Sequence, residues 1–166
     1  MIVVSDTTPL NYLVLIQVID ILPAVFQEVY VPPSVIAELL HLKAPDVVRA
    51  WAQSPPAWLK IAAPSIRLPS TALLDDGEAD ALSLAKERQI TDVLIDERRG
   101  RNVAQREGLT PLPTLTVLEK AAELDLLDLP TTIQKLQATS IRVPQDRINA
   151  ALARDVARRS RPKSGS

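Results

Sequence analysis

The chain of 166 residues has no cysteine, only one histidine and no basic segment at its start. Without cysteine it forms neither disulfides nor thiolate metal sites, which agrees with a reducing compartment. Residues 1–6 lack the positive charges that open a secretory signal peptide, so we expect none. The apolar stretch 9–26 is interrupted by Asp20 and Pro23, which makes it unsuitable as a membrane span. We therefore expect a cytoplasmic protein with no membrane segment.

A large excess of charge of one sign is also lacking. The formal net charge is −1, so the net charge of the molecule does not attract nucleic acid or an anionic membrane. Hydrophobic residues make up 46% and charged residues 23%, a composition that favours a folded core over disorder. We expect residues 1–145 to form one domain, 146–158 an amphipathic C-terminal helix, and 159–166 a disordered basic tail.

Short β-branched segments alternate with amphipathic ones along the chain, which predicts an α/β fold with a mainly parallel sheet. Leu40 and Leu42 are predicted to be core residues of their helix. Strands are predicted at 2–5, 28–31, 58–61, 92–95 and 109–112, and helices at 8–16, 18–24, 34–42, 45–53, 114–123, 131–137 and 143–158, with two further helices beginning near residues 75 and 97.

The segment 73–101 contains two of the candidate site residues. Its first helix is expected to open at Asp75 or Asp76, and Glu78 then lies at the rim of the apolar face. The buried strand that follows ends on Asp96, and ligands of open α/β sheets bind at the carboxyl ends of strands. Two alternatives remain open: Glu78 as a capping-box partner and Asp96 as a helix cap.

Asp6 stands at a second junction of the same kind, directly after the strand 2–5 and before a helix. Thr8 is the expected cap of that helix. Glu38 lies among apolar residues of the helix 34–42, where a charged side chain can also belong to a solvated edge. His41, three residues later, gives a single Glu-x-x-His, a weak metal signal.

Four carboxylates at one edge of the sheet would repel each other. Two carboxylates ~5 Å apart repel by about 3 kcal/mol at an effective dielectric constant of 20. A divalent cation relieves this repulsion, and oxygen ligands without cysteine or paired histidine indicate Mg²⁺ or Mn²⁺. Such a site activates water for attack on a phosphodiester. Arg98, Arg99 and Arg101 could bind its phosphates, or they simply form an exposed helix start.

Four segments stand in this order along the chain: VVSDTTPLNYL, VPPSVIAELL, LDDGEADALSLAKE and VLIDERRGR. In these segments the chain resembles the PIN domain family, and more narrowly the VapC-type toxin ribonucleases, and the resemblance covers about residues 2–140. The resemblance implies a Rossmann-like α/β/α sandwich and a metal-dependent endoribonuclease. It places the four acids of the family on Asp6, Glu38, Glu78 and Asp96, as catalytic and metal-binding residues, and a small hydroxyl residue on Thr8.

The sequence departs from the family pattern at two places. The third acid is more often Asp in the VapC type, and here both Glu78 and Asp80 are available. Helix geometry favours Glu78, because Asp80 is ~200° further round the helix. The glycine-rich turn usual after the last strand is replaced by residues 111–114. The resemblance also implies an RNA substrate, a homodimer and an inhibitory antitoxin partner.

Two other functions of α/β proteins fit the sequence less well. A haloacid-dehalogenase-like phosphotransferase needs an Asp where Thr8 stands, and a response-regulator receiver needs an acid pair and a lysine that the sequence does not supply. The main alternative is a catalytically inactive PIN-like protein that binds protein or RNA.

Overall fold

The computed structural model describes residues 1–162. Its strands are β1 (Ile2–Ser5), β2 (Glu28–Val31), β3 (Leu59–Ile61), β4 (Asp92–Leu94) and β5 (Thr110–Leu112). They form one parallel sheet in the order β3-β2-β1-β4-β5. The predicted α/β/α architecture is thus confirmed. Because β1 lies in the centre, with β2 and β4 on either side, its carboxyl end is the point where the strand order reverses, and open α/β sheets bind ligands there.

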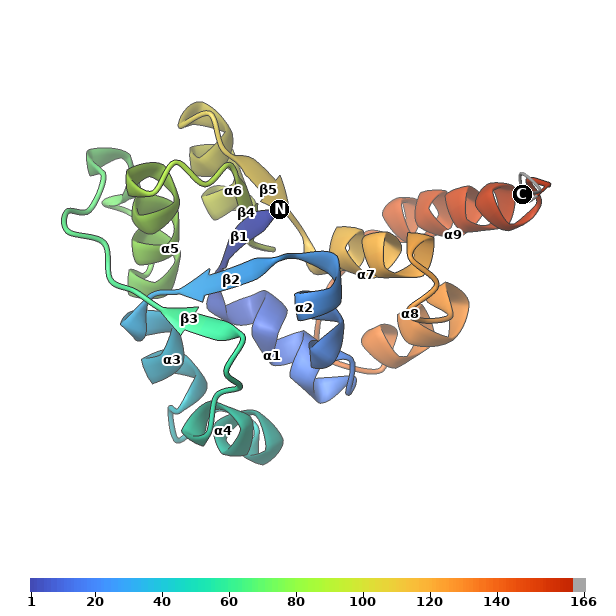
Figure 1. Cartoon of the computed structure of the whole chain (residues 1–166), viewed down its shortest axis with the longest axis horizontal. Coiled ribbons are helices and arrows are strands. Elements are labelled where there is room, and N and C mark those ends of the chain that lie inside the picture. The colour runs from blue at the N-terminus through green and yellow to red at the C-terminus, as the bar shows by residue number, and fades with distance from the viewer. Residues whose placement is uncertain (163–166) are drawn as a thin grey trace. The chain divides into compact units, whose positions relative to one another are not determined.

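Helices cover both faces of this sheet. In Figure 1, α5 and α6 lie on one face, and α1, α3 and α4 lie on the other. The helices are α1 (Thr7–Leu15), α2 (Leu22–Val25), α3 (Pro33–Leu39), α4 (Asp46–Gln53), α5 (Asp76–Glu87), α6 (Arg98–Arg106), α7 (Thr114–Glu123), α8 (Leu129–Gln137) and α9 (Gln145–Arg159), with 3₁₀ turns η1 (Ile19–Ile21) and η2 (Pro69–Thr71).

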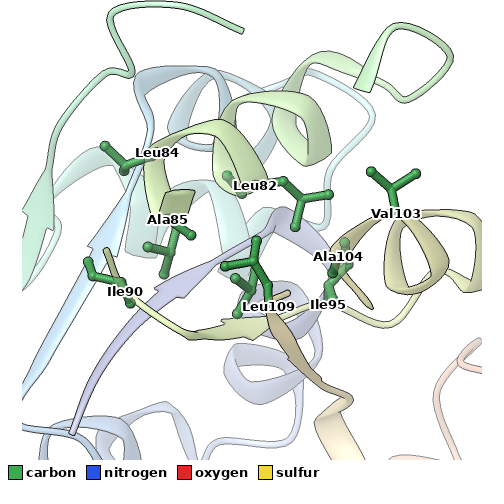
Figure 2. Packing of buried hydrophobic residues seen from close by; sticks show 11 residues of the cluster. Leu82, Leu84, Ala85, Ile90, Ile95, Val103, Ala104 and Leu109 are labelled. Atoms are coloured by element: carbon green, nitrogen blue, oxygen red, sulfur yellow. The ribbon is translucent and has the colours of Figure 1, made fainter. Parts of the chain in front are cut away.

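One hydrophobic cluster fixes α5 and α6 on the sheet. The cluster contains Leu82 and Ala85 of α5, Ile95 directly after β4, and Ala104 of α6 (Figure 2). Val93 of β4 belongs to the same cluster. The exposed fraction of each of these five side chains is 0%. Burying a Leu or Ile side chain stabilises a fold by roughly 1.5–3 kcal/mol, so this packing holds α5 and α6 on the sheet.

Several helix boundaries differ from the sequence predictions by one to three residues, and two of these differences concern residues with a predicted role. Helix α3 ends at Leu39, and the chain then turns, so Leu40 is 38% and Leu42 84% exposed instead of belonging to the core. Helix α1 begins at Thr7, and the cap position falls on Asp6 instead of Thr8. Helical periodicity cannot show where a helix stops, because apolar residues continue past the end of α3.

By its internal contacts the chain divides into two compact units, Met1–Thr114 and a second that begins at Leu115. Within the second unit α8 packs on α9, and the Arg154 guanidinium binds the Glu119 carboxylate at 2.8 Å. The final helix α9 agrees with the predicted helix 143–158 to within two residues. The sequence predicts a disordered tail at 159–166, but Arg159 is still helical, as the last residue of α9. Residues 163–166 of this predicted tail lie outside the described part of the chain.

Across residues 1–162, no single helix has the length and apolar character needed to cross a membrane. Helix α1 and the segment 19–25 meet the length and composition requirements only as a pair, bent by 118°.

Candidate metal centre and cleft

The first acid is held at the centre of the sheet edge. Asp6 follows β1, and its backbone amide donates to the carbonyl of Leu94 at the end of β4, at 2.9 Å. The side chain is only 2% exposed, and although it occupies the cap position of α1 it makes no capping hydrogen bond. Its Oδ1 has no hydrogen-bond partner. A buried carboxylate oxygen without a partner destabilises the fold, so this oxygen is suited to bind a cation or a hydrogen-bond donor from outside the chain.

The second acid, Glu38 of α3, is held by two different helix starts. Its Oε2 accepts a short hydrogen bond from the Thr7 hydroxyl, and its Oε1 accepts from the Gly77 amide at 3.1 Å. A Cβ on residue 77 would lie 2.8 Å from both carboxylate oxygens. A side chain at position 77 would therefore displace the Glu38 carboxylate from the position it takes beside the backbone of α5.

Two further acids lie at the start of α5. Asp75 is the cap residue, and its Oδ1 accepts from the Glu78 amide at 2.8 Å, as predicted for a helix that opens at this point. Glu78 is 6% exposed. Burial, the negative charge of Asp75 and a side-chain hydrogen bond with Asp75 raise the pKa of Glu78 from 4.5 to about 7. Such a shift marks a site where acids crowd together with little water.

Asp6, Glu38 and Asp75 each place a carboxylate oxygen within 4.8 Å of the others. Burial raises the pKa of Asp6 well above its usual range, and the charges of Glu78, Asp75 and Glu38 add to this effect, although a hydrogen bond from the Thr7 amide opposes it. The group offers only carboxylate oxygens as ligands, and one of its residues, Asp6, has an oxygen without a hydrogen-bond partner. These residues therefore suit a hard divalent cation such as Mg²⁺ or Mn²⁺.

The fourth predicted acid, Asp96, has different partners. Its Oδ1 accepts from the Thr114 amide at 2.8 Å and its Oδ2 from the Thr114 hydroxyl at 2.6 Å. Burial raises the pKa of Asp96, whereas these hydrogen bonds and the positive charge of Arg101 lower it. The cap position of α6 belongs to Glu97, so the open alternative of Asp96 as a helix cap is wrong.

A cleft of about 650 Å³ opens beside the acids. Of the predicted site residues, Thr8 and Glu78 line it together with Arg98 and Arg99, whose side chains are exposed. Arg101 is half-buried, and its charge acts on Asp96. The rest of the lining is contributed by Leu73, Leu74, Asp75, Glu97 and Asn102.

Asp80, the alternative third acid, points to another partner. Its Oδ1 lies 2.7 Å from Nε of Arg67, and Arg67 also binds Asp76 at 3.0 Å. The structure thus brings Asp6 and Glu38 together with Asp75 and places Glu78 beside them. Sequence reasoning assigned Asp75 only as a cap. The adjacent acids Asp75 and Asp76 of the LDDGE segment indicate that an acid lies at this helix start, but the sequence does not show which of the two faces Asp6 and Glu38.

An acid-lined cleft at the reversal point of a parallel α/β sheet defines the class of α/β proteins that bind their ligands at the carboxyl edge. The family model described as a PIN domain matches residues 2–156, and the chain belongs to this family. PIN domains are generally nucleases that use divalent metals, in agreement with the acidic group at the sheet edge. No curated protein matches the chain.

Proposed function

We propose that this protein is a Mg²⁺- or Mn²⁺-dependent endoribonuclease that hydrolyses RNA phosphodiester bonds with Asp6, Glu38, Glu78 and Asp96. The observation that carries the proposal is the buried Asp6 carboxylate, whose Oδ1 has no partner, within a group of three acids beside an open cleft. A divalent cation bound there supplies an activated water and stabilises negative charge on the phosphate.

The chain's own residues support this reading because they hold two of the four acids in fixed orientations. The Thr7 hydroxyl and the Gly77 amide orient the Glu38 carboxylate, and the Thr114 amide and hydroxyl orient that of Asp96. Such preorganisation lowers the reorganisation needed when substrate arrives.

Substrate binding is assigned to the cationic side of the cleft. Arg98 and Arg99 are exposed at the start of α6, where guanidinium groups and the helix N-terminus both favour phosphate. The Thr8 hydroxyl and the Asn102 amide offer further hydrogen bonds to the same space. Asp75, Glu78 and Glu97 line the same cleft and would repel a phosphate, so anionic substrate and cation should bind together.

The proposal is tested by cleavage of a panel of RNAs, with a DNA panel in parallel, in Mg²⁺, Mn²⁺ or EDTA. Asp6→Asn and Glu38→Gln should lower metal-dependent cleavage at least tenfold. Asp46→Asn is the matched control, because Asp46 is an exposed acid of α4 paired only with Arg49 in the part of the chain described. RNA binding without cleavage in any metal would instead support the inactive binding module.

The toxin role, a cognate antitoxin and a homodimer are proposals that rest on the resemblance to VapC-type toxins. Expression of the protein in a bacterial host should arrest growth, and Asp6→Asn should remove the arrest. Light scattering of the purified chain would give its oligomeric state. Cleavage of RNA without growth arrest would retain the nuclease and remove the toxin role.

A further inference from the structure

We infer that Asp75 is a ligand of the divalent cation and joins the metal centre to the cleft, in addition to capping α5. This inference rests on the proposed function, because it assigns a further residue to the same metal centre.

The geometry places Asp75 in the metal centre. A carboxylate oxygen of Asp75 lies within 4.8 Å of oxygens from both Asp6 and Glu38, and no other such group of ligand atoms occurs among the described residues. Asp6 in this group is 98% buried and its Oδ1 has no partner, an observation independent of the clustering of acids. Three ionised carboxylates at this separation repel one another, and a hard divalent cation that binds all three relieves the repulsion.

Asp75 also differs from the other two acids in its position relative to the cleft. It is exposed and lines the cleft, whereas Asp6 and Glu38 are not among the lining residues. A cation held by the three acids would therefore be reached from the cleft through Asp75. Asp6 and Glu38 alone would hold it on the buried side, away from a phosphate bound by Arg98 and Arg99.

One carboxylate serves both the helix and the cation. The Asp75 Oδ1 accepts from the Glu78 amide, which satisfies one of the free amides of the first turn of α5. A carboxylate has two oxygens and about four acceptor positions, so capping leaves capacity for a metal. Ligation at Asp75 would in addition fix the backbone of Glu78, which lines the cleft.

The neighbouring acid provides a matched control. Asp76 carries the same charge one residue later, but its side chain is 74% exposed and binds Arg67. Asp75→Asn removes the charge and keeps a residue that caps helices well, and Asp75→Ser does the same with a hydroxyl. Asp76→Asn removes the same charge from a position outside the group.

The experiment is Mn²⁺ titration of the full chain by calorimetry, without RNA, together with urea unfolding in EDTA. Asp75→Asn and Asp75→Ser should weaken Mn²⁺ binding at least tenfold while the urea midpoint in EDTA stays equal or rises. Asp76→Asn should change Mn²⁺ affinity less than threefold. If Asp75→Asn should unfold, the Asp75→Ser variant gives the same test.

Two outcomes separate the inference from the proposed function. If Asp6→Asn abolishes Mn²⁺ binding and Asp75→Asn weakens it no more than Asp76→Asn does, then Asp75 is only a cap and the nuclease proposal stands. If the unmodified chain binds no Mn²⁺ at millimolar concentration, the metal centre itself is wrong and the proposed function fails with it.

Discussion

At the scale of single residues, Asp6 is the acid of the metal centre whose burial most disfavours a negative charge. Its carboxylate is buried, one oxygen has no partner, and three other acids raise its pKa. Asp6→Asn keeps the shape and removes the charge, so the metal-free protein should gain about 0.5–2 kcal/mol in free energy of unfolding. Urea unfolding in EDTA measures this gain. With Mn²⁺ added, the variant should show none of the stabilisation that binding to the native state gives.

The contrary result for Asp6→Asn would be a lower urea midpoint in EDTA together with a normal response to Mn²⁺. That combination would mean that the carboxylate supports the fold directly and that the cation binds elsewhere. Asp46→Asn should leave both measurements unchanged, because the exposed pair of Asp46 with Arg49 contributes little.

Gly77 makes the second residue-scale prediction. Replacement of glycine by alanine inside a helix ordinarily stabilises it by about 0.5–1 kcal/mol. Here the added Cβ would lie 2.8 Å from both oxygens of Glu38, so Gly77→Ala should displace this carboxylate, weaken Mn²⁺ binding and stabilise the fold by less than this ordinary amount. In a Glu38→Ala background the same substitution should give the ordinary stabilisation. A double-mutant cycle by urea unfolding measures this coupling, and additive effects would show that the close approach is unimportant.

At the scale of elements, the rotational phase of α5 decides which acid faces the cleft. Glu78 is buried and lines the cleft, whereas Asp80 binds Arg67 away from it. Glu78→Gln should therefore lower RNA cleavage at least tenfold, about 1.4 kcal/mol of transition-state stabilisation, and Asp80→Asn should lower it less. Initial cleavage rates at saturating Mn²⁺ give the comparison. Equal losses would mean that total negative charge, and not position, matters.

The elements were largely predictable from the sequence because the relevant signals are local. Short β-branched runs predicted β1 and β2 with their observed bounds, and the acid pair Asp75 and Asp76 predicted where α5 begins. The end of α3 was not predictable, since the apolar residues Leu40 and Leu42 continue its pattern into a turn.

The site was predictable only in part, because its contacts join distant segments. Strand-end position indicated Asp6 and Asp96, but the pairing of Asp96 with Thr114 spans 18 residues and depends on how β5 leads into α7. The approach of Asp75 to Asp6 likewise depends on the packing of α5 beside α3, which no local pattern encodes. The assignment of Glu38 as a ligand remains a prediction, although the structure does bring it to Asp6.

At the scale of the whole molecule, the acidic group makes stability depend on pH. The pKa of Glu78 is about 7 in the folded chain and 4.5 ordinarily, so between these values the folded state binds more protons than the unfolded state. Stability of the metal-free protein should therefore fall as pH rises from about 4.5 to about 7. The raised pKa values of Asp6 and Asp96 act in the same direction.

Urea midpoints in EDTA at pH 5 and pH 7.5 test this dependence. Glu78→Gln should reduce the difference between the two midpoints, and saturating Mn²⁺ should reduce it in the unmodified chain, because a bound cation favours the ionised carboxylates. Greater metal-free stability at pH 7.5 than at pH 5 would contradict the raised pKa values.

The central position of β1 has a kinetic consequence. The acids of the metal centre follow β1, lie in α3 and precede α5, so positions 6, 38 and 75 meet only after β1, α3 and α5 have assembled. A cation bound by all three therefore recognises the finished fold and not an early intermediate. Interactions absent from the folding transition state slow unfolding and leave refolding unchanged. In stopped-flow chevron plots, Mn²⁺ should accordingly lower the rate constant of unfolding and leave that of refolding unchanged. The metal would then stabilise the native state kinetically, by slowing its unfolding.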